Sequence, residues 1–128
     1  MQTLHHPDGL AVRFDANAFS AEPIDRGYRF VPVDAAEQRS PQAVDLTLEQ
    51  GAGAAGSWPE SKELDGRRVR YRIDTRPGGS AGDLFVLIAW VDCSARHVMV
   101  RQEAQAETPA EADFNPAWSL LSGATCSA

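Results

Sequence analysis

Three histidines are the candidate metal ligands or acid–base groups of this chain, and they are His5, His6 and His97. The adjacent pair would point to opposite faces of a strand, which is poor geometry for chelating one ion. No cysteine or histidine stands at the spacing of a zinc finger or of an HExxH helix. We therefore expect structural or solvated histidines and no metal site.

Hydrolysis would need either a nucleophilic serine on a strand-to-helix elbow or two carboxylates held in unlike environments. Ser80 lies in a glycine-rich segment, residues 78–82, whose composition is typical of a turn. The aspartates and glutamates are spread along the chain, and none stands in an apolar context that would clearly raise its pKa. The sequence therefore predicts no catalytic residues.

A glycine pattern also resembles a dinucleotide-binding fingerprint, with Gly51, Gly53 and Gly56 in Gly-x-Gly-x-x-Gly spacing. That mechanism needs a helix N-terminus directly after the glycines to hold the pyrophosphate. Here Ser-Trp-Pro-Glu follows instead, at residues 57–60. We interpret the segment as a surface loop.

The elements that would position any site repeat with a period of two, which is typical of half-buried strands. Such alternation predicts strands at residues 10–14, 28–31, 43–49, 68–74 and 97–103. Residues 83–91 are apolar on both faces, as in a strand at the middle of a sheet. The Asp65-Gly66 pair predicts a tight hairpin turn between two strands.

Helix is predicted over residues 108–121, where Thr108 would cap the first turn and Glu111 would complete a capping box. Pro116 is expected to break this segment in two, and Gly123 to end it. We expect a mainly β, antiparallel sandwich-like fold of about seven or eight strands with one short C-terminal helix. Residues 1–128 would form a single domain.

Charge and hydropathy exclude two classes of partner. The chain has 18 acidic and 12 basic residues among 128, a formal net charge of -6. A dedicated nucleic-acid binder needs a basic footprint, so that class is disfavoured. The longest apolar run, residues 84–91, is too short for a membrane span.

Arg68, Arg70 and Arg72 form a basic stripe on one face of a predicted strand. One interpretation is a surface for an acidic partner or polyanion. The other is a solvated face whose arginines pair across strands with Asp45 or Glu49.

Two cysteines, Cys93 and Cys126, permit one disulfide. Closing a loop of about 30 residues would stabilise the fold by about 3–4 kcal/mol in the chain-entropy model. The alternative is two unrelated free thiols. A bridge would imply an oxidising compartment.

The first nine residues lack the basic region, apolar stretch and cleavage site of a signal peptide. If Met1 is the native start, the protein is expected in the cytoplasm. If a leader preceded this sequence, an exported location is open.

The order of several short motifs resembles a known protein family. These motifs are His6-Pro7-Asp8-Gly9-Leu10, Arg39-Ser40-Pro41, Trp58-Pro59, Arg70-Tyr71-Arg72-Ile73, Gly78-Gly79-Ser80-x-Gly82 and Ala89-Trp90. Over residues 6–121 the chain is similar to small periplasmic immunity proteins of bacterial type VI secretion systems. The group it resembles neutralises a secreted, calcium-binding muramidase toxin.

This resemblance implies a non-enzymatic, β-rich protein that plugs the glycan-binding groove of a secreted peptidoglycan-degrading effector with its loops. It implies a periplasmic location and a lipid anchor in the full-length precursor. No cofactor of the chain's own is implied, and calcium would take part only through the toxin.

By their position in turns and loops, six residues are the expected partner-binding set: Asp8, Trp58, Gly79, Ser80, Gly82 and Asp83. The acidic members could mimic substrate contacts or approach calcium held by the toxin. The acidic net charge would steer the chain toward a basic toxin. The alternative function is a small periplasmic carbohydrate- or peptide-binding module, with Trp58 exposed beside polar groups. A hydrolase is a third and weaker interpretation.

Overall fold

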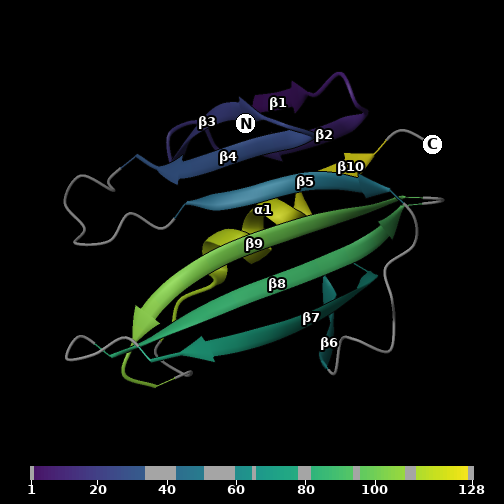
Figure 1. Ribbon diagram of the computed structural model, residues 1–128. Helices are drawn as coiled ribbons and strands as arrows, with labels where there is room; N and C mark the ends of the chain where they lie inside the picture. Colours follow the sequence, from purple (N-terminus) through teal and green to yellow (C-terminus); the bar gives the residue numbers. More distant parts are fainter. Residues whose placement is uncertain are drawn as a thin grey trace.

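The computed structural model describes residues 2–33, 43–50, 60–64, 66–77, 82–93, 96–108 and 112–126 (Figure 1). Its elements are β1 (Gln2–His5), β2 (Leu10–Phe14), β3 (Phe19–Ile24), β4 (Gly27–Pro32), β5 (Val44–Gln50), β6 (Glu60–Leu64), β7 (Arg67–Arg76), β8 (Asp83–Cys93), β9 (Arg96–Ala106), α1 (Asn115–Ser122) and β10 (Ala124–Cys126).

Two antiparallel sheets make up the fold. The larger has the strand order β3-β4-β5-β9-β8-β7-β6, and the smaller has the order β1-β2-β10. The α1 helix contacts β2, β5 and β9, so it packs between the two sheets. We call the side of the large sheet that carries α1 and the small sheet the inner face. The opposite side is the outer face, which Figure 1 shows in front of α1.

Alternation along the strands explains why one face forms the core. In β5, Val44, Leu46 and Leu48 are buried, whereas the residues between them are partly exposed. Leu10, Val12 and Phe14 of β2 close the same cluster from the small sheet. Burying one such aliphatic side chain contributes about 1.5–3 kcal/mol, so the layers are held mainly by apolar burial.

The expected mainly β sandwich-like fold with one C-terminal helix is confirmed. Each predicted strand is present. Asp65 of the predicted turn lies outside the described residues, but Leu64 pairs with Arg67 and Gly66 has a φ of 79°, as a hairpin at this position requires. The described part of the chain has ten strands rather than the expected seven or eight. The additional strands are β1, β3 and β10, which lie at sheet edges where one side of the backbone has no neighbouring strand.

The helix differs from its prediction. The α1 helix begins at Asn115, with Pro116 in its first turn, so the proline starts the helix instead of breaking it. Thr108 lies outside the helix, in a bend, and Glu111 lies outside the described residues. Gly123 ends the helix as predicted.

The α1 helix is held at both ends by side chains of the large sheet. The Gln102 Nε2 of β9 donates to the Asp113 carbonyl oxygen at 2.9 Å, and its Oε1 accepts from the Ala117 N–H at 3.0 Å. Gln102 is 0% exposed. At the other end, the Arg67 guanidinium donates to the Leu121 carbonyl oxygen at 2.9 Å. Eight residues are too few for a stable isolated helix, so these bonds supply caps that the helix lacks.

Trp118 also fixes the helix to the sheet. Its ring contacts Tyr71 of β7 edge-to-face, with centroids 5.2 Å apart, and the Lys62 Nζ lies 4.3 Å from its centroid. Trp118 therefore docks the helix on the large sheet. No helix among the described residues is long and apolar enough to cross a membrane.

Candidate functional site

The predicted partner-binding residues do not gather in one place. Asp8 is exposed in the turn between β1 and β2, where its N–H donates to the His6 Nδ1 at 3.2 Å. The Arg96 Nη1, from the start of β9, donates to the Asp8 carbonyl oxygen at 2.7 Å. Because Arg96 pairs with Cys93, this turn lies at the end of β8.

Asp83 and Gly82 lie at the beginning of β8. Asp83 pairs with Ala106 at the far end of β9. The eleven residues of β8 span about 33 Å at about 3.3 Å per residue. Asp8 and Asp83 are therefore at opposite ends of the large sheet, so one small interface cannot include both.

Gly82 is a site where only glycine fits. Its φ is 100°, and a Cβ there would come 2.5 Å from the Ala106 carbonyl oxygen. The backbone geometry accounts for this glycine without a partner. Its partner-binding role stays a prediction.

Trp58, Gly79 and Ser80 lie outside the described residues, as does the Gly-x-Gly-x-x-Gly segment. Residues 78–82 match the letters of the Gly-x-Ser-x-Gly serine hydrolase motif. However, they connect β7 to its antiparallel neighbour β8, whereas the nucleophile elbow needs a strand followed by a helix. The strand that follows the motif along the chain therefore differs from the helix that this elbow requires.

The cysteines end two strands of different sheets, Cys93 in β8 and Cys126 in β10. Cys126 pairs with Leu10, two residues after Asp8, and Arg96 joins the Asp8 turn to the end of β8. The backbone thus brings both strand ends to the same turn. The cysteine side chains lie outside the description, so the disulfide stays a prediction.

Two of the described histidines, His6 and His97, make structural contacts. A backbone N–H donates to the His6 Nδ1, so the Nε2 carries the hydrogen that is donated to the Ile24 carbonyl oxygen at 3.2 Å. The His6 ring also contacts Tyr28 edge-to-face. His97 is buried beside Trp90, with ring centroids 5.8 Å apart. Among the described residues, no three His, Cys, Asp or Glu side chains are placed to hold a metal ion.

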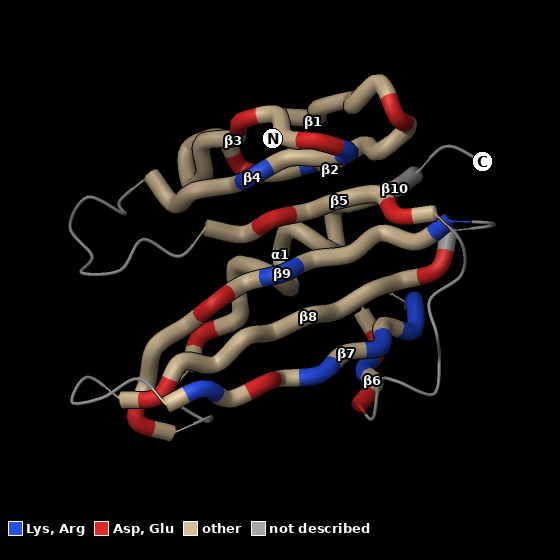
Figure 2. The backbone as a smooth tube through the Cα atoms, viewed as in Figure 1, with Lys and Arg blue, Asp and Glu red and all other residues tan. Residues whose placement is uncertain are grey.

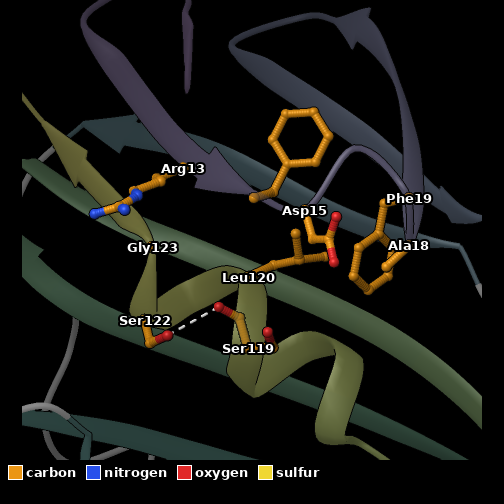
Figure 3. A pocket seen from close by; sticks show the side chains of 9 residues that line it. Arg13, Asp15, Ala18, Phe19, Ser119, Leu120, Ser122 and Gly123 are labelled. Carbon is orange, nitrogen blue, oxygen red and sulfur yellow. Dashed lines mark hydrogen bonds between the residues drawn. The ribbon is translucent and has the colours of Figure 1, made fainter. Parts of the chain in front are cut away.

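A pocket of about 440 Å³ lies between α1, β2 and the turn before β3 (Figure 3). Its lining residues are Arg13, Phe14, Asp15, Ala18, Phe19, Ser119, Leu120, Ser122 and Gly123. The Asp15 Oδ1 already accepts from the Asn17 N–H at 2.9 Å. The Ser122 hydroxyl donates to the Ser119 carbonyl oxygen at 2.9 Å. These polar groups are used by the local turns, and the pocket lining pairs no nucleophile with a base.

Positive and negative side chains alternate from strand to strand across β4, β5 and β9 on the outer face. Arg29 of β4 hydrogen-bonds Asp45 of β5 at 2.8 Å, and Arg101 of β9 lies next in the register. The Arg101 Nη2 is 2.7 Å from the Glu103 Oε1. The hydrogen bond from Asp45 raises the pKa of the Arg29 guanidinium above its ordinary value. Arg29, Asp45, Arg101 and Glu103 surround a shallow pocket of about 220 Å³.

A second group of charges follows β7, and Figure 2 shows it as several blue segments separated by tan ones and by one red segment. We call it the arginine stripe: Arg68, Arg70, Arg72 and Arg76. The expectation that the stripe pairs with Asp45 or Glu49 is wrong, because β8 and β9 separate β7 from β5. Asp45 pairs with Arg29, and Glu49 pairs with Arg26 at 2.8 Å.

Trp90 is buried, although it lies on the outer face. It is 2% exposed, and its neighbours Ala89 and Val91 point into the core cluster instead. The Arg70 guanidinium lies 6.0 Å from the Trp90 ring centroid. The burial of Val86 on the same side agrees with the prediction that β8 is covered on both faces.

Comparisons with known proteins agree with this architecture. A protein from Bacteroides thetaiotaomicron with a crystal structure has the same fold, with a TM-score of 0.70 at 5% identity. The match covers 98% of this chain, which spans about half, 48%, of that protein.

A curated relative, the immune protein Tsi3 of Pseudomonas aeruginosa PAO1, is 30% identical over 125 residues. The alignment covers 94% of this chain and 79% of Tsi3. The type six secretion immunity 3 (Tsi3) domain matches residues 5–125, almost the whole sequence. The chain belongs to the Tsi3 family of type VI secretion immunity domains.

Proposed function

We propose that this chain is a non-enzymatic immunity protein that occludes the active-site groove of a secreted, cell-wall-degrading muramidase and so protects the producing bacterium. The observation that carries the proposal is the match of residues 5–125 to a type VI secretion immunity domain. An immunity domain implies a secreted effector as partner. The muramidase class of that effector is the proposed part.

The architecture supports an inhibitor that works by shape. Several described titratable groups are engaged in local turns or ion pairs, as at His6, Asp15 and Asp45. A layered sheet with apolar burial presents its turns and outer face on a rigid base. Such a base pre-organises a binding surface, which lowers the entropy cost of association.

The turns at either end of the large sheet are candidates for the part of the chain that enters the active-site groove of the effector. One end carries Asp8, and the other carries Gly82 and Asp83. A carboxylate at either end could approach a calcium ion held by the toxin. In this proposal, calcium belongs to the effector and the immunity protein contributes at most an oxygen ligand.

The proposed compartment is the periplasm, since a cell-wall hydrolase has its substrate there. Sulfhydryl oxidation is favoured in that compartment. A bridge between Cys93 and Cys126 would therefore be consistent with export.

The test is to mix the purified chain with the products of neighbouring genes, with and without calcium, and to measure both binding and lysis of peptidoglycan. We expect nanomolar binding to one cell-wall hydrolase and stoichiometric loss of its lytic activity. Absence of binding to every neighbour would overturn the proposal and would direct attention to glycan and peptide ligands.

The two ends of the sheet are separated by matched variants, Asp8→Asn and Asp83→Asn. Each removes one charge and keeps the size of the side chain. The end that enters the groove should lose affinity, and the other variant should bind like the wild type. Unchanged affinity in both would exclude the acidic turns as the contact.

A further inference from the structure

We propose that the arginine stripe on the outer face of β7 is a docking surface for a carboxylate-bearing surface of the effector. This inference rests on the proposed function, because it takes the effector as the partner. The stripe would contact the effector through the outer face of the large sheet, in addition to the contacts proposed for the turns at Asp8 and Asp83.

The stripe is a straight row. Its arginines occupy alternating positions of β7, so they point to the same side of the sheet. From Arg68 to Arg76 the row extends about 26 Å, at about 3.3 Å per residue. Figure 2 shows the row interrupted by one acidic residue, Asp74, which lies 3.4 Å from the Arg72 Nε. This length matches one side of an ordinary protein interface.

The two ends of the stripe, Arg68 and Arg76, differ from other arginines of the outer face, whereas Arg72 has Asp74 as an acidic neighbour. Arg26, Arg29 and Arg101 each contact a carboxylate oxygen at 2.8 Å or less. Within the described residues, no carboxylate lies within ion-pair distance of Arg68 or Arg76.

Their register neighbours do not neutralise the row. Glu63 of β6 pairs with Arg68 along the backbone, and Leu84 of β8 pairs with Arg76. Glu63 forms no ion pair with Arg68 in the described structure, and Leu84 carries no charge. Like charges two residues apart on one face of a strand repel one another weakly in water, because solvent and salt screen them. An acidic partner would remove this repulsion.

The neighbouring strand makes this surface suitable for a protein. Ile88 of β8 pairs with Arg72, and Trp90 pairs with Arg70. Ile88 is partly exposed between the stripe and Arg101. Trp90 is buried, so Ile88 is the apolar side chain that a partner could contact here. Arginine beside apolar side chains is typical of interface centres, where its planar guanidinium binds carboxylates through two hydrogen bonds.

The chemistry of the proposed effector supplies the complement. Glycoside hydrolysis generally uses a pair of aspartate or glutamate side chains, so we expect the proposed muramidase to carry carboxylates at its groove. A nucleic acid is disfavoured as the occupant, because the whole chain carries a net charge of -6.

The experiment compares charge reversals at Arg68→Glu and Arg76→Glu, which are the two exposed ends of the stripe. The matched control is Arg13→Glu, an exposed arginine of β2 in the small sheet. Each variant changes the net charge by the same amount. Affinity for the effector is measured by calorimetry at several salt concentrations, and circular dichroism checks that each variant is folded.

We expect each stripe variant to bind the effector about tenfold more weakly than the wild type, with a smaller dependence of affinity on salt. Arg13→Glu should remain within about twofold. Equal affinity of the stripe variants and wild type would overturn the docking surface while leaving the proposed function intact. An equal loss in Arg13→Glu would also overturn it, because the effect would then come from net charge alone. If the wild type binds no effector, the proposed function itself fails.

Discussion

The two faces of the large sheet are built from the same strands but differ in what their side chains do. On the inner face, apolar residues such as Leu46 and Val100 pack against α1 and the small sheet. On the outer face, the residues next to them in sequence, such as Asp45 and Arg101, form charged rows. Because successive residues of a strand face opposite sides of the sheet, one strand can supply core residues on one face and binding residues on the other. Changes on the inner face should affect folding, and changes on the outer face should affect binding.

The largest expected effect comes from the core of the inner face. Leu46→Ala removes a side chain that is 0% exposed, which should lower the free energy of unfolding by about 2–5 kcal/mol. The neighbour on the outer face, Thr47→Ala, should cost less than about 1 kcal/mol. Urea denaturation of both variants measures the contrast. Equal losses would mean that the outer side of β5 is packed as tightly as the inner side.

The predicted disulfide would join the two sheets. Mass spectrometry without reduction should show that Cys93 and Cys126 together lack two hydrogen atoms, and reduction should restore them. Replacing both cysteines with serine should lower the free energy of unfolding by about 3–4 kcal/mol, since the bridge closes a loop of about 30 residues. Free thiols in protein purified from an oxidising compartment would contradict the bridge.

The hydrogen bonds at the start of α1 should have a smaller but specific effect. Gln102→Ala leaves the Asp113 carbonyl oxygen and the buried Ala117 N–H without their partner, at a cost of about 2–3 kcal/mol. Hydrogen exchange should speed up mainly in α1. The control is Gln105→Ala, an exposed glutamine three residues along the same strand. Uniform acceleration across the sheet would show that Gln102 supports the whole core and not the helix.

The smallest effect is expected for an ion pair of the outer face. Arg101→Ala breaks the contact with Glu103, but both side chains are about 40% exposed, at 43% and 41%. Solvent screens such pairs, so the free energy of unfolding should change by less than about 1 kcal/mol. A thermal denaturation series in rising salt should bring the variant and the wild type closer together. A larger loss would mean that the charged rows hold the sheet together.

Much of the fold follows from local patterns. Alternation was enough to predict β2, β5, β7 and β9, because each strand has one buried and one solvated face. The Asp65-Gly66 pair predicted the β6–β7 hairpin for a similar local reason.

The missed elements depend on distant partners. Among them, β10 is only three residues long and exists because Ala124 pairs with Val12 of the small sheet. The start of α1 was misplaced because its cap comes from Gln102, thirteen residues before Asn115, and not from Thr108. No local propensity encodes such contacts.

The candidate site could be predicted less well. Sequence reasoning placed Asp8 and Asp83 in one set, since both stand beside glycine-rich turns, but the register separates them by the length of β8. It did identify the arginine stripe, and it left open whether β5 would supply acidic partners. Strand order decides that question, because β8 and β9 lie between β5 and β7. Strand order is a long-range property that alternation does not reveal.

The central claim is that this chain protects cells from a secreted cell-wall hydrolase. The most direct measurement expresses the neighbouring effector in the periplasm of a sensitive host and follows lysis by the fall in optical density. The chain is supplied either with an export signal or without one. The account predicts that the exported chain prevents lysis and that the cytoplasmic chain does not. Lysis at the same rate with the exported, folded chain present would contradict the claim.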